Sequence, residues 1–194
     1  MLRVCVFSGS STGTNVQHRH TTIALARALA TRGLELVYGG GCVGLMGVLA
    51  DAMLAAGGRV IGVIPRTLMQ REVGHRGLTE LRIVDSMHER KAEMVALSDG
   101  FIALPGGFGT LDEMFEVLTW AQLGVHAHPC GVLNSDGFFD ALFAYLDRAV
   151  AEGFVRAEHR AMWMADDDPE RLLDRFAEYR PPAIEKWLPS DRRA

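Results

Sequence analysis

Short apolar runs alternate along the chain with longer segments whose apolar residues recur at helical spacing. The runs predict strands at residues 2–7, 34–38, 59–64, 79–85, 100–105, 129–134 and 162–165. Helical spacing predicts helices over 15–31, 43–56, 87–98, 107–121 and 138–152, and a last helix that opens at Asp168-Pro169-Glu170. This alternation is typical of an α/β protein with about seven parallel strands and helices on both faces of the sheet.

The remaining segments predict little regular structure. Residues 65–79 read as an irregular loop with one helical turn, and Thr14 and Gln17 are spaced like a capping box at the start of the first helix. Residues 181–194 read as a C-terminal tail whose last six residues are frayed and solvated. Because no linker, repeat or low-complexity tract interrupts the pattern, residues 1–194 are predicted to form one domain.

Composition and charge exclude some classes of partner. The 194 residues include 48% hydrophobic and 23% charged residues, and the formal net charge of −4 indicates neither a nucleic-acid-binding nor a membrane-binding surface. The three cysteines Cys5, Cys42 and Cys130 lie in or beside apolar stretches, which predicts buried thiols in a reducing compartment. No secretory signal or bilayer-spanning run is present, so a cytoplasmic location is expected.

Three glycine-rich loops follow predicted strands: "SGSSTGT" (8–14), "GGGCVGLMG" (39–47) and "PGGFGT" (105–110). In a doubly wound sheet, ligands bind beyond the carboxyl ends of the strands, where these loops meet. Glycine lets the backbone approach a ligand closely, and a following helix presents unpaired N–H groups to an anion. The three loops together therefore predict a phosphate site, with Ser10, Gly106, Gly107, Gly109 and Thr110 as candidate ligand-binding residues.

Simpler interpretations of these loops stay open. A glycine-rich turn is often only a tight connection between two elements. No Lys-Ser or Lys-Thr pair completes a Walker A motif, and "GGGCVG" (39–44) lacks the acidic residue about 20 positions later that a dinucleotide site requires.

Two carboxylates follow the third loop at helical spacing. Glu113 and Glu116 lie one and two turns beyond the predicted phosphate site and are neighbours on one helix face. A carboxylate at that distance from a nucleotide phosphate would face the ribose, where it could stabilise an oxocarbenium-like transition state or activate a water molecule. The alternative is that both are solvated surface residues.

A second charged group, "SMHERKAEM" (86–94), falls at the same predicted sheet edge. Arg90 could donate two hydrogen bonds to a phosphate or to a carboxylate, and Lys91 follows it directly. The alternative is a solvated helix face on which Glu89, Arg90, Lys91 and Glu93 pair with one another.

The sequence predicts neither a metal nor a cofactor. His126 and His128 could form a metal pair, but no third ligand stands out, and neither HExxH nor CxxC occurs. "GSS" (9–11) fits a ligand loop better than a nucleophile elbow.

Taken together, these motifs resemble those of one known family. "PGGFGTLDE" (105–113) is similar to the PGGxGTxxE signature of the LONELY GUY (LOG) family of cytokinin riboside 5′-monophosphate phosphoribohydrolases, which are often labelled possible lysine decarboxylases. "VCVFSGSS", "RGLELVYGGGCVGLMG", "GGRVIGVIP", "MHERKAEM", "LTWAQLGVH" and "GFFDALFAYLDRAVAEGF" resemble the family in the same order, so the likeness covers nearly the whole chain.

The resemblance implies a modified Rossmann fold and hydrolysis of an N6-modified adenosine 5′-monophosphate to free base and ribose 5-phosphate. It implies that Arg90 and Glu113 are the catalytic pair, that Gly107, Gly109 and Thr110 hold the phosphate, and that the substrate site is lined by Lys91, Thr119 and Glu72. It also implies a homodimer or larger homo-oligomer with sites near the subunit interface. One departure is visible, because His128 stands where the family usually has lysine.

Two rival functions follow from the same residues. Lysine decarboxylation would need a lysine that binds pyridoxal phosphate, and Lys91, the only candidate, sits in a charged run. A non-catalytic nucleotide-binding or carrier protein would keep the glycine loops but would not need Arg90 and Glu113 together, so the sequence favours an enzyme.

Overall fold

The computed structural model describes residues 1–69 and 73–182 and confirms the predicted α/β architecture. All seven strands lie in one parallel sheet of order β4-β3-β2-β1-β5-β6-β7. The strands are β1 (Arg3–Phe7), β2 (Glu35–Tyr38), β3 (Val60–Pro65), β4 (Glu80–Val84), β5 (Phe101–Ala103), β6 (Cys130–Leu133) and β7 (Trp163–Asp166).

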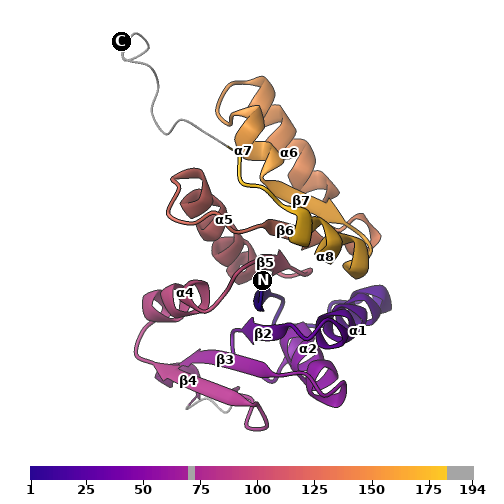
Figure 1. Ribbon diagram of the computed structural model, residues 1–194, viewed down its shortest axis with the longest axis vertical. Coiled ribbons are helices and arrows are strands. Elements are labelled where there is room, and N and C mark those ends of the chain that lie inside the picture. The colour runs from indigo at the N-terminus through magenta and orange to yellow at the C-terminus, as the bar shows by residue number, and fades with distance from the viewer. Residues whose placement is uncertain (70–72, 183–194) are drawn as a thin grey trace.

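The helices cover both faces of this sheet (Figure 1). Helices α1 (Val16–Thr31), α2 (Gly44–Ala55) and α8 (Pro169–Glu178) lie on one face, and α4 (Met87–Ala96), α5 (Phe108–Gln122) and α6 (Asp140–Ala151) lie on the other. Two short helices, α3 (Arg66–Met69) and α7 (Ala157–Ala161), and one 3₁₀ turn, η1 (Ser135–Gly137), complete the described elements. The sequence pattern predicted the turn at α3 but missed α7.

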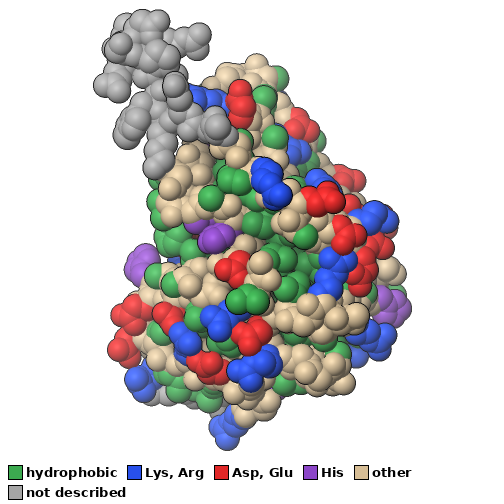
Figure 2. All heavy atoms as spheres, viewed as in Figure 1, with side chains coloured by type: hydrophobic (Ala, Val, Ile, Leu, Met, Phe, Trp, Pro, Cys, Tyr) green, Lys and Arg blue, Asp and Glu red, His purple; other side chains and the backbone are tan. Residues whose placement is uncertain are grey.

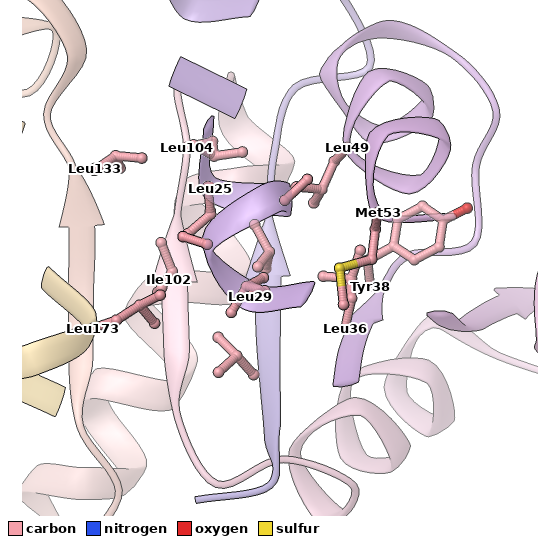
Figure 3. Close-up of a cluster of buried hydrophobic side chains, with 14 of the residues drawn as sticks. Leu25, Leu29, Leu36, Tyr38, Leu49, Met53, Ile102, Leu104, Leu133 and Leu173 are labelled. Atoms are coloured by element: carbon pink, nitrogen blue, oxygen red, sulfur yellow. The ribbon is translucent and has the colours of Figure 1, made fainter. Parts of the chain in front are cut away.

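The strands are apolar on both sides because each face of the sheet packs against helices. Figure 3 shows the first of the two cores, in which Leu25 and Leu29 of α1 pack against Leu36 and Tyr38 of β2. The second core joins the opposite face of the sheet to α4, α5 and α6, with Phe101 of β5 at its centre. This packing fixes α4 and α5 side by side above the strands that precede them.

The strand order reverses between β1 and β5, and this reversal determines where a ligand can bind. Strand β1 pairs with β2 on one side, through Val6 and Tyr38, and with β5 on the other, through Val6 and Ile102. The chain leaves these neighbouring strands in opposite directions, which opens a crevice beyond their carboxyl ends. The first and third glycine loops meet there, and the backbone N–H of Gly9 donates to the carbonyl of Pro105 at 3.1 Å.

The second glycine loop packs onto the first at the same edge. The backbone N–H of Leu45 donates to the carbonyl of Gly9 at 3.0 Å, and Gly44 has a φ of +60°. A Cβ at Gly44 would lie 2.2 Å from the carbonyl carbon of Ser10, so only glycine fits this position. The loops thus form one continuous surface of backbone rather than three separate turns.

Two helix starts show how far local sequence signals hold. Asp168 caps α8 by accepting from the backbone N–H groups of Glu170 and Arg171, with proline at the first turn, as predicted. Helix α1 begins differently: Asn15, not Thr14, is the N-cap, and its side chain accepts from the N–H of Gln17. The predicted capping box is therefore wrong, because a stronger Asx cap is available one residue later.

Acidic and basic side chains are interspersed on the face of the molecule shown in Figure 2, with no large region of one sign. Within residues 1–69 and 73–182, no helix combines the length and the apolar character needed to cross a membrane. Cys5 and Cys130 are buried as expected, but Cys42 is exposed. Its prediction as a core thiol is wrong because Cys42 lies in the loop after β2, at the open edge of the sheet, and not in the strand.

The predicted tail at 181–194 falls almost entirely outside the described residues.

Candidate active site

A cleft of about 450 Å³ opens at the crevice beyond β1 and β5. Its lining comes from the end of β1, the glycine loop after β2, β3, and the starts of α2, α4 and α5, together with α3 and the loop that follows it. The lining includes Ser10, Gly107, Gly109 and Thr110 from the predicted phosphate loops together with Arg90 and Glu113. One cleft therefore contains residues of the predicted phosphate loops and the two charged residues that the sequence singled out.

Arg90 and Glu113 form a buried ion pair. Arg90 Nη1 lies 2.8 Å from Glu113 Oε1, and each side chain is only 10% exposed. Arg90 Nε also donates to the carbonyl of Val63 in β3 at 3.1 Å, so the guanidinium is fixed on two sides. Arg90 is therefore not part of a solvated helix face, and its fixed position holds the Glu113 carboxylate in the cleft.

The protonation of Glu113 reflects competition between burial and this arginine. Burial raises the pKa of Glu113 above its ordinary value because it removes water from the charged form, and Asp112 and Glu116 add to the increase. Arg90 and, more weakly, Lys91 lower the pKa of Glu113 and oppose that increase. A carboxylate whose pKa is raised while it stays next to a cation is suited to exchanging protons with a water molecule.

Lys91 and Glu116 lie beside the cleft rather than in its lining. Lys91 Nζ bridges Asp112 Oδ2 and Glu116 Oε2, at 3.2 Å from each. Asp112 does line the cleft, and Lys91 balances its charge next to the site where an anion would bind. The sequence placed Glu113 and Glu116 on one face, but only Glu113 faces the cleft.

The end of the cleft at α5 is formed by backbone. Thr110 is buried, and a Cβ on Gly106 would lie 2.1 Å from its Oγ1, so the turn can close on Thr110 only with glycine at position 106. A Cβ on Gly107 or Gly109 would meet nothing within 4 Å, which means that these two positions face open space. Their N–H groups belong to the unpaired first turn of α5 and are available to an anion.

The predicted phosphate loop at residues 105–110 also borders a second hollow, of about 390 Å³. This hollow contains Gly106 and the hydroxyl-rich loop from Ser10 to Thr14, and it shares Gly9, Ser10 and Gly107 with the cleft. The three glycine loops thus separate two accessible spaces, of which only the cleft contains the Arg90–Glu113 pair.

The sequence analysis missed the role of Gly39, the first residue after β2. A Cβ at this position would lie 1.8 Å from Arg90 Nη2, so the guanidinium occupies the space that any other residue would need. The glycine run was visible, but its link to Arg90 depends on the position of α4. The apolar wall, which includes Val43, Met46, Leu68 and Val73, was also not predicted.

Replacing Gly39 with alanine is expected to displace Arg90 and to lower by about tenfold or more the turnover that the sequence resemblance implies, because a misplaced side chain loses much of its effect. Turnover of a nucleoside monophosphate by the two proteins measures this. The control is a double-mutant cycle with Arg90→Ala: if the clash with Arg90 is the cause, Gly39→Ala costs almost nothing further in that background. Equal effects in both backgrounds would contradict the assignment.

Comparison with known proteins identifies the family of this chain. Residues 46–176 match a family model described as "Possible lysine decarboxylase". The chain is 52% identical over 179 residues, 92% of its length and 79% of the relative's, to the probable cytokinin riboside 5′-monophosphate phosphoribohydrolase LOGL9 of Oryza sativa subsp. japonica. The chain belongs to the LOG family. The LOG1 phosphoribohydrolase of Arabidopsis thaliana is 46% identical over 92% of the chain and 84% of the relative.

Solved structures extend the likeness in fold beyond the LOG family. The molybdenum cofactor binding protein of Rippkaea orientalis superposes with a TM-score of 0.68 over 91% of this chain and 96% of its own, at 22% identity. At that identity the likeness shows a shared fold only.

Thr119, which the LOG resemblance places in the substrate site, is not brought to the cleft. Thr119 lies near the other end of α5, donates to the carbonyl of Phe115 at 2.7 Å, and borders a different hollow. Glu72 lies outside the described residues. His128, at the position of the usual LOG lysine, lies against His126, with ring centroids 5.5 Å apart.

The pair His126 and His128 shows no metal-binding arrangement. His126 Nε2 lies 2.8 Å from the carbonyl of Val117, and His126 Nδ1 accepts from the N–H of His128 at 3.2 Å. Among the residues that the structure describes, no group of three or more potential metal ligands is present.

Proposed function

We propose that this chain hydrolyses the N-glycosidic bond of N6-modified adenosine 5′-monophosphates, giving the free base and ribose 5-phosphate. The single observation that carries the proposal is the buried Arg90–Glu113 pair in the same cleft as the N-terminus of α5. The names of the LOG relatives support it: LOG1, at 46% identity, is a cytokinin riboside 5′-monophosphate phosphoribohydrolase, and LOGL9, at 52%, is described as a probable one.

In this proposal the substrate phosphate binds the backbone N–H groups of Gly107, Gly109 and Thr110, with Ser10 and Gly106 completing the turn. Phosphate suits this end because a helix N-terminus favours negative charge. Lys91 neutralises Asp112 and Glu116, whose carboxylates would otherwise repel the phosphate. The phosphate therefore acts as an anchor and places the ribose over the middle of the cleft.

Glu113 then lies beside the anomeric carbon, one turn of helix from the phosphate. As the bond between C1′ and the base nitrogen breaks, its electron pair leaves with the base and positive charge develops on the ribose. The Glu113 carboxylate stabilises that charge and accepts a proton from the attacking water, whose oxygen bonds to C1′. The departing base takes up a proton from solvent, and Glu113 then returns the proton it accepted to solvent. Arg90 keeps the carboxylate aimed at the reacting atoms.

The substrate assignment is tested by incubating the protein with AMP, isopentenyladenosine monophosphate and adenosine and measuring the free base by chromatography. Both monophosphates are expected to release base, and adenosine is expected to react at least about 100-fold more slowly, because it lacks the charged anchor. Tight binding of intact nucleotide without release of base would instead favour the carrier function.

We also propose a homodimer, or a larger homo-oligomer, located in the cytoplasm. Exposed apolar side chains at the rim of the cleft support an interface there: Val43, Met87 and Phe108 are 38%, 45% and 95% exposed and all border the cleft. Thr119 and Glu116 could line a substrate site only as part of such an assembly or after rearrangement. Light scattering coupled to size-exclusion chromatography tests the assembly, and a monomer at micromolar concentration would contradict it.

A further inference from the structure

A third hollow, of about 120 Å³, lies away from the cleft. It is enclosed by the C-terminal half of α5, by α6, by α7 and by the start of β7. Its lining residues are Phe115, Leu118, Thr119, Gln122, Leu146, Val155, His159, Arg160 and Trp163. An apolar cavity of about 150 Å³ holds a benzene molecule, so this hollow suits a ligand of about six non-hydrogen atoms.

Two residues that line this hollow each carry a buried nitrogen atom that has no hydrogen-bond partner among the described residues. These atoms are Nε1 of Trp163, a residue only 4% exposed, and Nε2 of His159. Buried polar groups in native proteins are nearly always paired, because an unpaired one costs about 1–3 kcal/mol. Of the three buried side-chain atoms without a partner in the described part of the chain, two therefore belong to residues that line one small hollow.

The chemistry of the lining favours a ligand that accepts hydrogen bonds. The indole Nε1–H can only donate, and one tautomer of the histidine ring also donates from Nε2. Burial and the nearby Arg156 lower the pKa of His159, which keeps that ring neutral. Arg160 adds a cation: its Nε donates to Asp147 at 2.8 Å and its Nη1 to the carbonyl of Trp163 at 3.5 Å, which leaves further N–H groups.

No carboxylate lines the hollow, and apolar side chains form the rest of its wall. Phe115 and Phe143 both pack edge-on against Trp163, with ring centroids 5.5 and 5.1 Å away. A ligand would therefore combine an anionic acceptor at the Trp163–His159–Arg160 end with a short apolar part against Leu118, Leu146 and Val155.

We propose that this hollow is a binding site for a small monocarboxylate with a short apolar chain, held by Trp163, His159 and Arg160. A modest turn of the indole or imidazole brings its nitrogen to the ligand oxygen. The site is independent of the proposed hydrolase function, because none of these three residues lines the cleft.

Sodium butyrate titrated into the full-length ¹⁵N-labelled protein tests the proposal, with the three tryptophan indole N–H resonances as reporters. The Trp163 resonance is expected to shift and saturate, while that of Trp120, which does not border the hollow, stays in place. Sodium chloride at equal ionic strength and butyramide, which has the same shape without the charge, are the matched controls. Each indole N–H resonance is assigned by its disappearance from the spectrum of the Trp163→Phe or the Trp120→Phe variant.

Trp163→Phe keeps an aromatic ring and removes the donor, so it is expected to weaken butyrate binding about tenfold or more while nucleotide turnover is unchanged. Trp120→Phe is expected to leave butyrate affinity as it was. Four results would overturn the proposal. Two concern the ligand: no saturable shift of the Trp163 resonance with butyrate, or an equal shift with butyramide. The other two are a bound water molecule on the Trp163 N–H that butyrate does not displace, and a shift that follows protein concentration, which would report a second copy of the protein over the hollow. The butyrate titration uses the unaltered protein, so this test remains valid even if the Trp163→Phe variant does not fold.

Discussion

Replacing Glu113 with glutamine is expected to lower kcat for a nucleoside monophosphate by about a thousandfold while binding of the nucleotide changes little. Glutamine keeps the size of the side chain and can still contact Arg90, but it has neither the negative charge that stabilises the ribosyl cation nor the basicity that accepts the water proton. General-base and electrostatic contributions of this kind are each about 10²–10⁴-fold in rate. Single-turnover kinetics and nucleotide titration of the variant measure the two effects separately.

Glu116→Gln is the matched control, because Glu116 lies on the same helix one turn later and pairs with Lys91 outside the cleft. Its kcat is expected to stay within about tenfold of the unaltered protein. Full activity in Glu113→Gln, or equal losses in both variants, would remove Glu113 from the proposed reaction.

Replacing Arg90 with alanine is expected to reduce both turnover and stability, because it leaves Glu113 buried without its cation. Breaking a buried pair by removing one partner costs about 3–5 kcal/mol of unfolding free energy, and each side chain of this pair is only 10% exposed. Denaturant unfolding measures this loss. Arg82→Ala is the control: Arg82 pairs with Glu80 and Glu93 at the surface, and its removal should cost about 1 kcal/mol or less.

The stability loss in Arg90→Ala should depend on pH in a defined direction. Without Arg90, burial raises the pKa of Glu113 further above its unfolded value, so the folded state binds the proton more tightly than the unfolded state does. Stability therefore falls as pH rises from the ordinary glutamate range through the raised pKa, and the difference from the unaltered protein is smallest in acid. A loss that is constant over pH 4–8 would mean that Glu113 is not the group left unpaired.

The same substitution should move the acid limb of the pH–rate profile. If the ionised Glu113 is the base, activity appears only above its pKa, and removal of Arg90 takes away the main influence that lowers this pKa. The acid limb of the pH profile of kcat, measured on the residual activity of Arg90→Ala, is then expected at higher pH than in the unaltered protein. An effect on KM alone would make Arg90 a binding residue.

Local signals in the sequence predicted most of the architecture. Apolar runs and helical spacing gave the seven strands and the six longer helices, because each such pattern reflects which side of an element is buried. The cap at Asp168 was predictable for the same reason, since the side chain and the N–H groups that it binds lie within three residues.

The Arg90–Glu113 pair was only partly determined in this way. The sequence by itself placed Arg90 and Glu113 after strands at one edge of a parallel sheet and, with the family motif, named them as partners. Their 2.8 Å contact depends on α4 and α5 packing side by side on one face, with Gly39 leaving room for the guanidinium. The choice between Glu113 and Glu116 was also made by packing, because residues three apart share a face and only the tilt of α5 decides which one enters the cleft. Cys42 was misjudged because local patterns show which residues lie on a helix or in a loop, whereas the direction in which a side chain points is fixed by the distant strands and helices that pack against it.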